Sequence, residues 1–208
     1  MIKSTVSIKD YGWKDSQAAC AHEYLTPQII NILMELHANS ILDLGCGNGA
    51  LAHKLGNRGF SVIGCDADKN GIKIANTIGD GNFKHLSVYD DPSTLGKRDF
   101  DIVTSIEVIE HLFIPRSLPR FAYEVLREGG HLIITTPYHG YIKNLVLSIF
   151  NKWDQHLDPL WDGGHIKIWS LKTLRKLLEE EGFEIKTFRG IGRLPYLWKS
   201  MLLVAQKK

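Results

Sequence analysis

Two carboxyl groups and two imidazoles are spaced so that they could bind a divalent cation. The segment E-V-I-E-H contains Glu107, Glu110 and His111 at positions i, i+3 and i+4, which lie on one face of a helical turn. It follows an apolar run typical of a strand, and His165 in D-G-G-H is a fourth candidate ligand. Such ligands suit Mg²⁺, Mn²⁺, Fe²⁺, Co²⁺ or Zn²⁺ alike. A cation held there could lower the pKa of a bound hydroxyl group and make it a nucleophile.

A glycine-rich turn predicts a site for a nucleotide-type cofactor. In the segment ILDLGCGNGALA, residues 41–52, Gly45, Gly47 and Gly49 follow an apolar strand and precede a helix. Glycines permit a sharp turn and close approach of a ligand, and the helix start attracts an anionic group. Asp66 closes the next strand about 20 residues later, where a carboxylate can accept hydrogen bonds from ribose hydroxyls. A dinucleotide would satisfy these features too.

Strands and helices alternate along the chain, and they would position both the candidate metal ligands and the glycine-rich turn. Apolar runs typical of strands occur at residues 41–44, 62–65, 101–105 and 132–135, and helical spacing at 50–55 and 118–126. A turn with Gly129 and Gly130 is expected before the last of these strands. This alternation predicts a parallel sheet with helices on both faces. A last amphipathic helix is expected from the N-cap Ser170 to Gly182. Two strands at 183–189 and 201–205 should then form an antiparallel pair at one edge.

Composition indicates an ordinary globular chain. Its 208 residues predict a single domain over 1–208, and the formal net charge of +2 gives no reason to expect a nucleic-acid partner. The cysteines Cys20, Cys46 and Cys65 show no pairing pattern, which indicates a reducing compartment. No run approaches the ~20 apolar residues of a membrane span. We therefore expect a cytoplasmic protein.

Five motifs in order carry a family resemblance. They are D-x-G-x-G-x-G at 43–49, the acid at 66, FD-x-V at 100–103, E-V-I-E-H-L at 107–112 and L-R-E-G-G at 126–130. Together they resemble the class I S-adenosylmethionine-dependent methyltransferases over roughly residues 38–206. The resemblance implies a Rossmann-like α/β fold, with a doubly wound, seven-stranded, mostly parallel sheet that ends in an antiparallel β-hairpin.

The resemblance also implies roles for residues of the cofactor site. The three glycines would line S-adenosylmethionine, Asp43 would lie near its methionine amino group, and Asp66 would hold the ribose hydroxyls. The remaining contacts would come from Tyr89 and Asp90 at the adenine and from Ile106 at the methionyl part.

Two groups within that family are similar at the reaction centre. These are the ubiquinone-biosynthesis O-methyltransferases and the small-RNA 3′-terminal 2′-O-methyltransferases, in which the resemblance implies a cation that holds adjacent substrate oxygens. Here its ligands would be Glu107, Glu110, His111 and His165. The same E-V-x-E-H also occurs in methyltransferases without a metal, and His165 would then be the general base, with His139 second and His111 a further catalytic candidate. We expect O-methylation of a small aromatic or polyhydroxylated metabolite.

Two segments should cover these sites. Residues 1–37 are expected to form an arm and a helix over the cofactor. Tyr11 and Trp13 in this arm are expected to stabilise it by packing on the sheet. Residues 138–169 are expected to form a substrate lid whose aliphatic residues pack on the sheet. The tryptophans of this region, beginning with Trp153, could instead form an aromatic wall over a substrate pocket, and this wall could also touch a membrane surface.

Three alternatives remain open at this point. An RNA 2′-O-methyltransferase would need basic and stacking side chains near the pocket, and Arg189, Arg193, Lys167, Lys199, Trp169 and Trp198 are candidates. A dehydrogenase-like domain would bind NAD at residues 45–50. A degenerate domain would bind the cofactor and act as a scaffold, although the retained Asp43, Asp66 and glycines argue against it.

Overall fold

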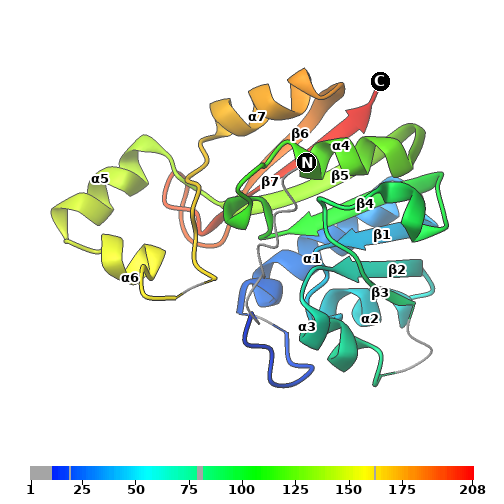
Figure 1. Ribbon diagram of the computed structural model, residues 1–208. Helices are drawn as coiled ribbons and strands as arrows, with labels where there is room; N and C mark the ends of the chain where they lie inside the picture. The colour runs from blue at the N-terminus through cyan, green and yellow to red at the C-terminus, as the bar shows by residue number, and fades with distance from the viewer. Residues whose placement is uncertain (1–10, 19, 79–81, 162) are drawn as a thin grey trace, which may run out of the picture.

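The computed structural model of the chain describes residues 11–18, 20–78, 82–161 and 163–208. In these residues seven strands form one sheet in the order β3-β2-β1-β4-β5-β7-β6 (Figure 1). The strands are β1 (Ser40–Leu44), β2 (Ser61–Asp66), β3 (Phe83–His85), β4 (Phe100–Ile106), β5 (Leu126–Pro137), β6 (Phe183–Ile191) and β7 (Ser200–Lys207). The helices are α1 (Cys20–Glu35), α2 (Ala50–Gly56), α3 (Lys69–Ala75), α4 (Ser117–Val125), α5 (Tyr141–Ile149), α6 (Trp153–Leu157) and α7 (Leu171–Glu180), with short 3₁₀ helices η1 (Pro92–Leu95) and η2 (Ile109–His111).

The pairing of the strands confirms the predicted sheet. Strands β1 to β5 pair in parallel, whereas β7 runs antiparallel to both β5 and β6. The chain builds outward from β1 to β3 and then returns to place β4 on the other side of β1. Ligands of open α/β sheets bind at such a reversal, outside the carboxyl ends of the strands. The fold therefore predicts a site where β1 and β4 end.

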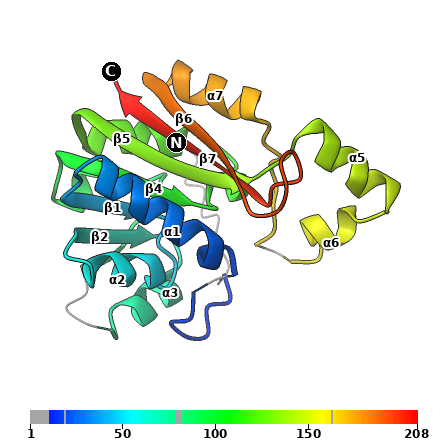
Figure 2. The same cartoon turned by 180° about the vertical axis from the view of Figure 1, so that it is seen from behind.

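Alternation along the strands divides the core between the two faces of the sheet. Ile41 packs with α1 and α2, whereas its neighbour Leu42 packs in the cluster that contains α4 and α7, because successive strand side chains point to opposite faces. Figure 1 shows α4 in front of the strands, and Figure 2, seen from behind, shows α1 in front of them. Phe121 of α4 and Leu33 of α1 are buried to 2% and 0% exposure. Both faces are thus covered, as a parallel sheet requires.

Both ends of helix α7 lie where the sequence predicts them. The Ser170 side chain accepts a hydrogen bond from the Thr173 backbone N–H (3.2 Å), and the Ser170 N–H donates to the Thr173 hydroxyl (3.1 Å). This reciprocal pair is a capping box. Gly182 follows the helix with φ 89°, the left-handed conformation that glycine adopts without strain.

Replacing Ser170 by alanine should therefore reduce the free energy of unfolding by about 1 kcal/mol, because one helix-end N–H loses its acceptor. The test is the midpoint and slope of a urea unfolding curve. Ser170→Thr is the matched control, since threonine also caps, and it should stay within a few tenths of a kcal/mol of the parent protein. Equal stability of the alanine and parent proteins would show that this cap contributes nothing.

Strand β5 begins earlier than the sequence predicts. A turn was expected at Gly129 and Gly130, with Leu126 still helical, but β5 begins at Leu126. The register between β4 and β5 shifts between Phe100 and Ile102, and Gly129 has φ 70° at this irregularity. Gly129 thus accommodates an irregularity within the strand, because its positive φ lets the extra residues leave the ladder without ending it.

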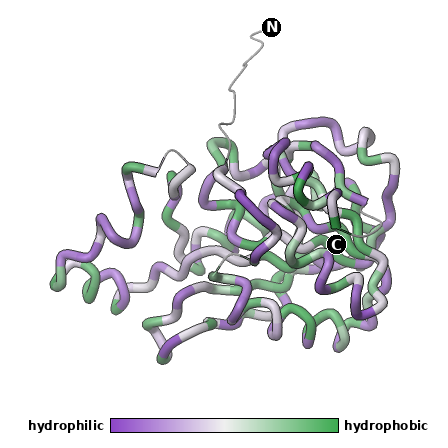
Figure 3. Tube along the Cα trace, turned by 90° about the horizontal axis from the view of Figure 1, so that it is seen from below, coloured by the Kyte–Doolittle hydropathy of each residue, from purple (hydrophilic) through white to green (hydrophobic). Residues whose placement is uncertain are grey.

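The lid contradicts one expectation. Its aliphatic residues were expected to pack on the sheet, but Lys143 is the residue that α5 buries. Tyr141, Ile149 and Phe150 are 82%, 66% and 64% exposed. Helices α5 and α6 project from the end of the sheet as a separate lobe (Figure 1), and hydrophobic residues recur along it in Figure 3. The apolar face has no sheet to cover because the lobe extends beyond the strands.

Two further expectations concern membrane insertion and thiols. Among the described residues, no helix has the length and apolar character needed to cross a membrane. Cys20 is exposed, Cys46 and Cys65 are buried, and all three are free thiols.

Candidate active site

The glycine-rich turn and the E-V-I-E-H segment meet at the carboxyl ends of β1 and β4. Gly45 follows β1 with φ 84°, and a Cβ atom there would lie 2.5 Å from a methyl carbon of Val108. Only glycine fits such a contact with this backbone conformation. The two motifs that the sequence separates by more than 50 positions therefore form one continuous surface.

Asp66 organises the glycine-rich turn. Its carboxylate accepts hydrogen bonds from the backbone N–H groups of Gly47 (2.8 Å) and Asp68 (2.7 Å). Asp68 in turn caps α3 and accepts the Tyr11 N–H at 2.8 Å. Burial raises the pKa of Asp66, while the backbone N–H donors oppose the rise. The carboxyl group lies at the end of β2, beside the turn, as the sequence predicts.

Asp43 is buried beneath the same turn. It is 2% exposed and accepts a hydrogen bond from the Thr104 hydroxyl at 2.9 Å. Burial raises the pKa of its carboxyl group to about 7, despite that hydrogen bond. A positively charged partner would lower this pKa again, because it favours the ionised carboxylate.

Three of the four candidate metal ligands converge. Glu110, His111 and His165 each offer one ligand atom, and these atoms all lie within 4.8 Å of one another. Glu110 is 1% exposed, and its Oε2 accepts the Thr136 hydroxyl at 3.0 Å. Its Oε1 is buried and has no hydrogen-bond partner among the described residues. Such an atom usually indicates a missing partner, since buried polar groups are otherwise satisfied.

The loop that carries His165 is tied to this group and fixes the His111 ring. The Glu110 carbonyl accepts the N–H groups of Ile166 and Lys167, both at 3.0 Å. His111 Nδ1 lies 3.1 Å from the Gly164 carbonyl, which can only accept, so Nδ1 carries the hydrogen. Burial and the neighbouring His165 lower the pKa of His111 to about 4. The Nε2 lone pair is then free to bind a cation. In metal-binding histidines a backbone carbonyl commonly accepts the N–H of one ring nitrogen in this way and leaves the other nitrogen for the metal.

Glu107 lies outside this group, and the expectation of a shared helical face is wrong for it. The helical turn η2 covers only Ile109–His111, and Glu107 precedes it with φ 56°. A positive φ in a non-glycine residue is uncommon and turns the side chain away from the helical direction. Burial raises the pKa of Glu107 to about 7, opposed by the Thr135 and Ser200 hydroxyls and by the charge of Lys143.

The N-terminal arm packs over the glycine-rich turn and also over the candidate ligands Glu110, His111 and His165, called here the metal-ligand group. Trp13 lies against Gly47, where a Cβ atom would be 2.5 Å from the indole ring, and its carbonyl accepts from the Asn70 side chain at 3.0 Å. The Tyr11 ring contacts His111 and Trp161 edge-on, with centroids 5.3 and 5.0 Å away. Residues 1–10 and 19 of the expected arm lie outside the described residues.

His139 belongs to a second histidine pair inside the lid. Its Nδ1 lies 3.2 Å from Asn144 Oδ1, and its Nε2 lies 3.4 Å from His156 Nε2. The Trp153 ring stacks on it at 6.1 Å. Burial lowers the pKa of His139 to about 4. Both ring nitrogens already have neighbours, so His139 is less available as a base than His165.

The remaining predicted residues occupy different environments. Ile106 is buried at the end of β4. Tyr89 is 43% exposed and its hydroxyl accepts the Ile114 N–H at 3.4 Å, whereas Asp90 accepts the Ser87 N–H at 2.8 Å. Of the tryptophans, Trp161 and Trp153 contact site histidines, while Trp169 is in the core.

Two residues of the site were missed by sequence reasoning. Thr136 holds Glu110, and its position at the end of the strand beside β4 could have indicated this. Lys143 is buried near Glu107, and burial lowers the pKa of its amine to about 8. It is the single cation in the apolar run Y-I-K-N-L-V-L-S-I-F, and nothing in that run shows which side of the helix faces inward.

Comparisons with known proteins bear on the cofactor class. A family model described as a methyltransferase domain matches residues 21–187. Ubiquinone biosynthesis O-methyltransferase of Rattus norvegicus is 30% identical over 168 residues, which are 77% of this chain and 49% of the rat protein. The enzyme of Hydrogenovibrio crunogenus is 28% identical over 89% of this chain and 80% of its own length. The chain thus spans about half the length of the rat relative.

Solved structures share the fold at low identity. A protein of Pyrococcus horikoshii superposes with a TM-score of 0.71 at 19% identity, covering 90% of this chain and 89% of its own. Magnesium protoporphyrin IX methyltransferase of Synechocystis, solved with bound SAH, gives 0.68 at 19% identity and covers 94% and 90%. They show the fold alone. The methyltransferase family model and the relative that is 30% identical, by contrast, argue against the nicotinamide alternative.

Proposed function

The chain belongs to the family of class I S-adenosylmethionine-dependent methyltransferase domains, and we propose that it methylates a hydroxyl oxygen of a small aromatic or polyhydroxylated metabolite with the help of a divalent cation. The observation that carries this proposal is the convergence of Glu110, His111 and His165 beside the glycine-rich turn. The relatives named as O-methyltransferases support oxygen as the acceptor atom.

We propose the cofactor roles that the family resemblance implies. Gly45, Gly47 and Gly49 would line S-adenosylmethionine, and Asp66 would accept hydrogen bonds from its ribose hydroxyls. Asp43, buried below the turn, would face the methionyl ammonium. The outer contacts would be Ile106 at the methionyl part and Tyr89 and Asp90 at the adenine.

The pKa of Asp43 makes cofactor binding depend on pH. The ammonium requires an ionised carboxylate, and with a pKa of about 7 the carboxyl group is mostly protonated at pH 6. The dissociation constant of S-adenosylhomocysteine should therefore be about tenfold larger at pH 6 than at pH 8. Calorimetric titration over this range is the measurement. Asp43→Asn should bind more weakly and lose the pH dependence, whereas binding of the parent protein that is equal at both pH values would contradict this role.

The residues present fit a divalent cation. Glu110 supplies a buried oxygen that has no hydrogen-bond partner in the described part of the chain, and His111 presents a lone pair that the Gly164 carbonyl orients. When bound, the cation would hold adjacent substrate oxygens and lower the pKa of the one to be methylated. Thr136 fixes Glu110, and the loop from Gly163 to Lys167 fixes His165.

The other residues would position the acceptor and exclude water. Methyl transfer from a sulfonium is an in-line displacement, so placing the oxygen against the methyl group supplies much of the rate. Tyr11 and Trp161 pack together above His111 and would close the site to solvent. If no cation is bound, we propose His165 as the general base. Its ring lies against that of His111, with centroids 4.9 Å apart, whereas His139 is paired with His156 inside the lid.

A transfer assay with labelled S-adenosylmethionine tests the function. Acceptors should include catechol, a polyhydroxylated compound, and an RNA with a 3′-terminal ribose diol beside its 2′-deoxy control. We expect methylation of the catechol that divalent cations increase. Transfer to the RNA diol alone would favour the RNA alternative, and nitrogen or carbon methylation would overturn the proposal.

The exposed face of α5 supports contact with a membrane surface or a lipophilic acceptor. Ile149→Asp combined with Phe150→Asp should reduce cosedimentation with anionic phospholipid vesicles severalfold, because these exposed apolar side chains lose their favourable burial. Met34→Asp, on an exposed position of α1, is the matched control. Equal sedimentation of all variants would remove α5 from such contact. The three free thiols support a reducing compartment, and we propose the cytoplasm.

A further inference from the structure

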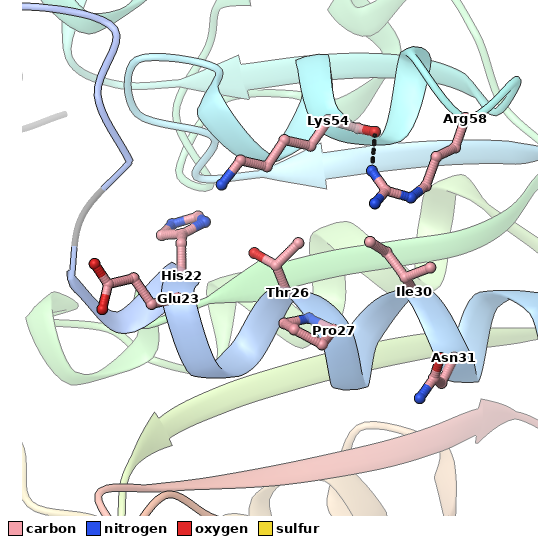
Figure 4. A pocket seen from close by; sticks show the side chains of 8 residues that line it. All are labelled: His22, Glu23, Thr26, Pro27, Ile30, Asn31, Lys54 and Arg58. Carbon is pink, nitrogen blue, oxygen red and sulfur yellow. Dashed lines mark hydrogen bonds between the residues drawn. The ribbon is translucent and has the colours of Figure 1, made fainter.

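A groove between α1 and α2 is separate from the proposed active site. It has a volume of about 440 Å³, and none of its lining residues belongs to the cofactor turn or to the metal-ligand group. Figure 4 shows His22, Thr26 and Ile30 of α1 directed toward α2. Lys54 lies on α2, and Arg58 lies two residues beyond the end of this helix at Gly56. The lining is completed by Glu23, Pro27 and Asn31.

Two polar atoms of this groove are buried without a partner. Thr26 is 6% exposed, and its hydroxyl makes no hydrogen bond within the described residues. His22 Nδ1 is likewise buried and unpartnered in that part of the chain. A helical threonine commonly donates to the carbonyl one turn earlier, and a buried polar group without any partner is costly. The described residues therefore leave the hydrogen-bonding capacity of both atoms unused.

Two cations face these donors. Lys54 is on α2, Arg58 follows the end of that helix four positions later, and Arg58 Nη1 donates to the Lys54 carbonyl at 3.2 Å (Figure 4). That bond uses one of the five N–H donors of the guanidinium and leaves the rest free. Across residues 11–18, 20–78, 82–161 and 163–208, neither cation forms a salt bridge. Burial and the charge of Lys54 lower the pKa of His22 to about 4, so its ring is neutral at pH 7.

We propose that the groove binds a small organic phosphate, with the phosphate on Lys54, Arg58, Thr26 and His22 and the organic part on Pro27 and Ile30. Four side chains that can donate hydrogen bonds suit the three terminal oxygens of a phosphate better than the two of a carboxylate. The volume lies within the roughly 300–1,000 Å³ of small-molecule sites. This site is independent of the proposed methyl transfer.

Calorimetric titration of the full chain with phenyl phosphate, inorganic phosphate and benzoate tests the proposal. Phenyl phosphate should bind most tightly, because it offers both the oxyanion and an apolar ring. Lys54→Ala and Arg58→Ala should each weaken its binding about tenfold or more, since each removes a charged donor. Lys172→Ala, an exposed lysine on α7, is the matched control and should bind like the parent protein.

Thr26→Val separates a ligand-directed hydroxyl from a structural one. It should weaken phenyl phosphate binding while leaving the thermal midpoint without ligand unchanged or higher, because the hydroxyl has no partner to lose. A lower midpoint with unchanged phosphate binding would overturn the role of Thr26. The proposal as a whole fails if phenyl phosphate does not bind at millimolar concentration, if benzoate binds equally well, or if the Lys54 and Arg58 variants bind as the parent does.

Discussion

Replacing Asp66 by alanine is expected to weaken S-adenosylhomocysteine binding by on the order of 1–3 kcal/mol, through lost hydrogen bonds to the ribose hydroxyls. The structure adds a second reason. The Asp66 carboxylate accepts the Gly47 and Asp68 N–H groups, and it thereby holds the glycine-rich turn in place. Calorimetric titration at pH 8 measures the change, since Asp43 is then ionised.

Two controls separate the loss of ribose hydrogen bonds from the loss of support for the glycine-rich turn. Asp66→Asn keeps one acceptor oxygen for the turn, so it should bind more tightly than the alanine variant but less tightly than the parent. Asp154→Ala, at an exposed position of α6, should leave the affinity unchanged. An unchanged affinity in a folded Asp66→Ala protein would remove Asp66 from the cofactor site.

The second large effect concerns the cation. At 100 times its dissociation constant, a cation that binds only the folded protein should add about 2.7 kcal/mol to the free energy of unfolding. Glu110→Gln and His165→Ala should each abolish this gain, because each removes one of three converging ligands. The measurement is the thermal midpoint with Mg²⁺, Mn²⁺, Fe²⁺, Co²⁺ or Zn²⁺ against a chelator.

Two nearby variants test whether the response belongs to this group. Glu107→Gln and His139→Ala should keep the cation response, since neither side chain lies in the converging set. S-adenosylhomocysteine affinity should stay nearly intact in the ligand variants, which would show that they fold. A response that survives His165→Ala would exclude His165 as an essential ligand. A parent protein that responds to no cation would instead leave His165 as the candidate base.

Local sequence signals predicted most of the fold. The apolar runs identified β1, β2, β4 and the core of β5, because buried parallel strands must be apolar on both faces. Ser170 and Gly182 marked the ends of α7, since caps are set by neighbouring residues. At Gly129 the sequence predicts a turn where the structure has an irregularity within β5, because a glycine with positive φ serves either structure and only the pairing of β4 with β5 decides which.

The lid shows where local signals fail. An apolar run such as residues 145–150 predicts burial, yet whether a surface exists to receive it depends on where the helix is placed. Here α5 extends beyond the sheet and turns Lys143 inward. The same limit applies to Glu107, whose spacing fits a helical face but whose φ of 56° removes it from one.

The sequence by itself determined the family, the sheet and the residues from which a site could be built, because each of these depends on motifs whose members are close along the chain. The tertiary structure alone decided which candidates meet. It joined Glu110 and His111 to His165, excluded Glu107, paired His139 with His156, and brought Tyr11 over the group. These contacts join residues that are distant in sequence. The conformation of the loops decides whether their side chains come within contact distance.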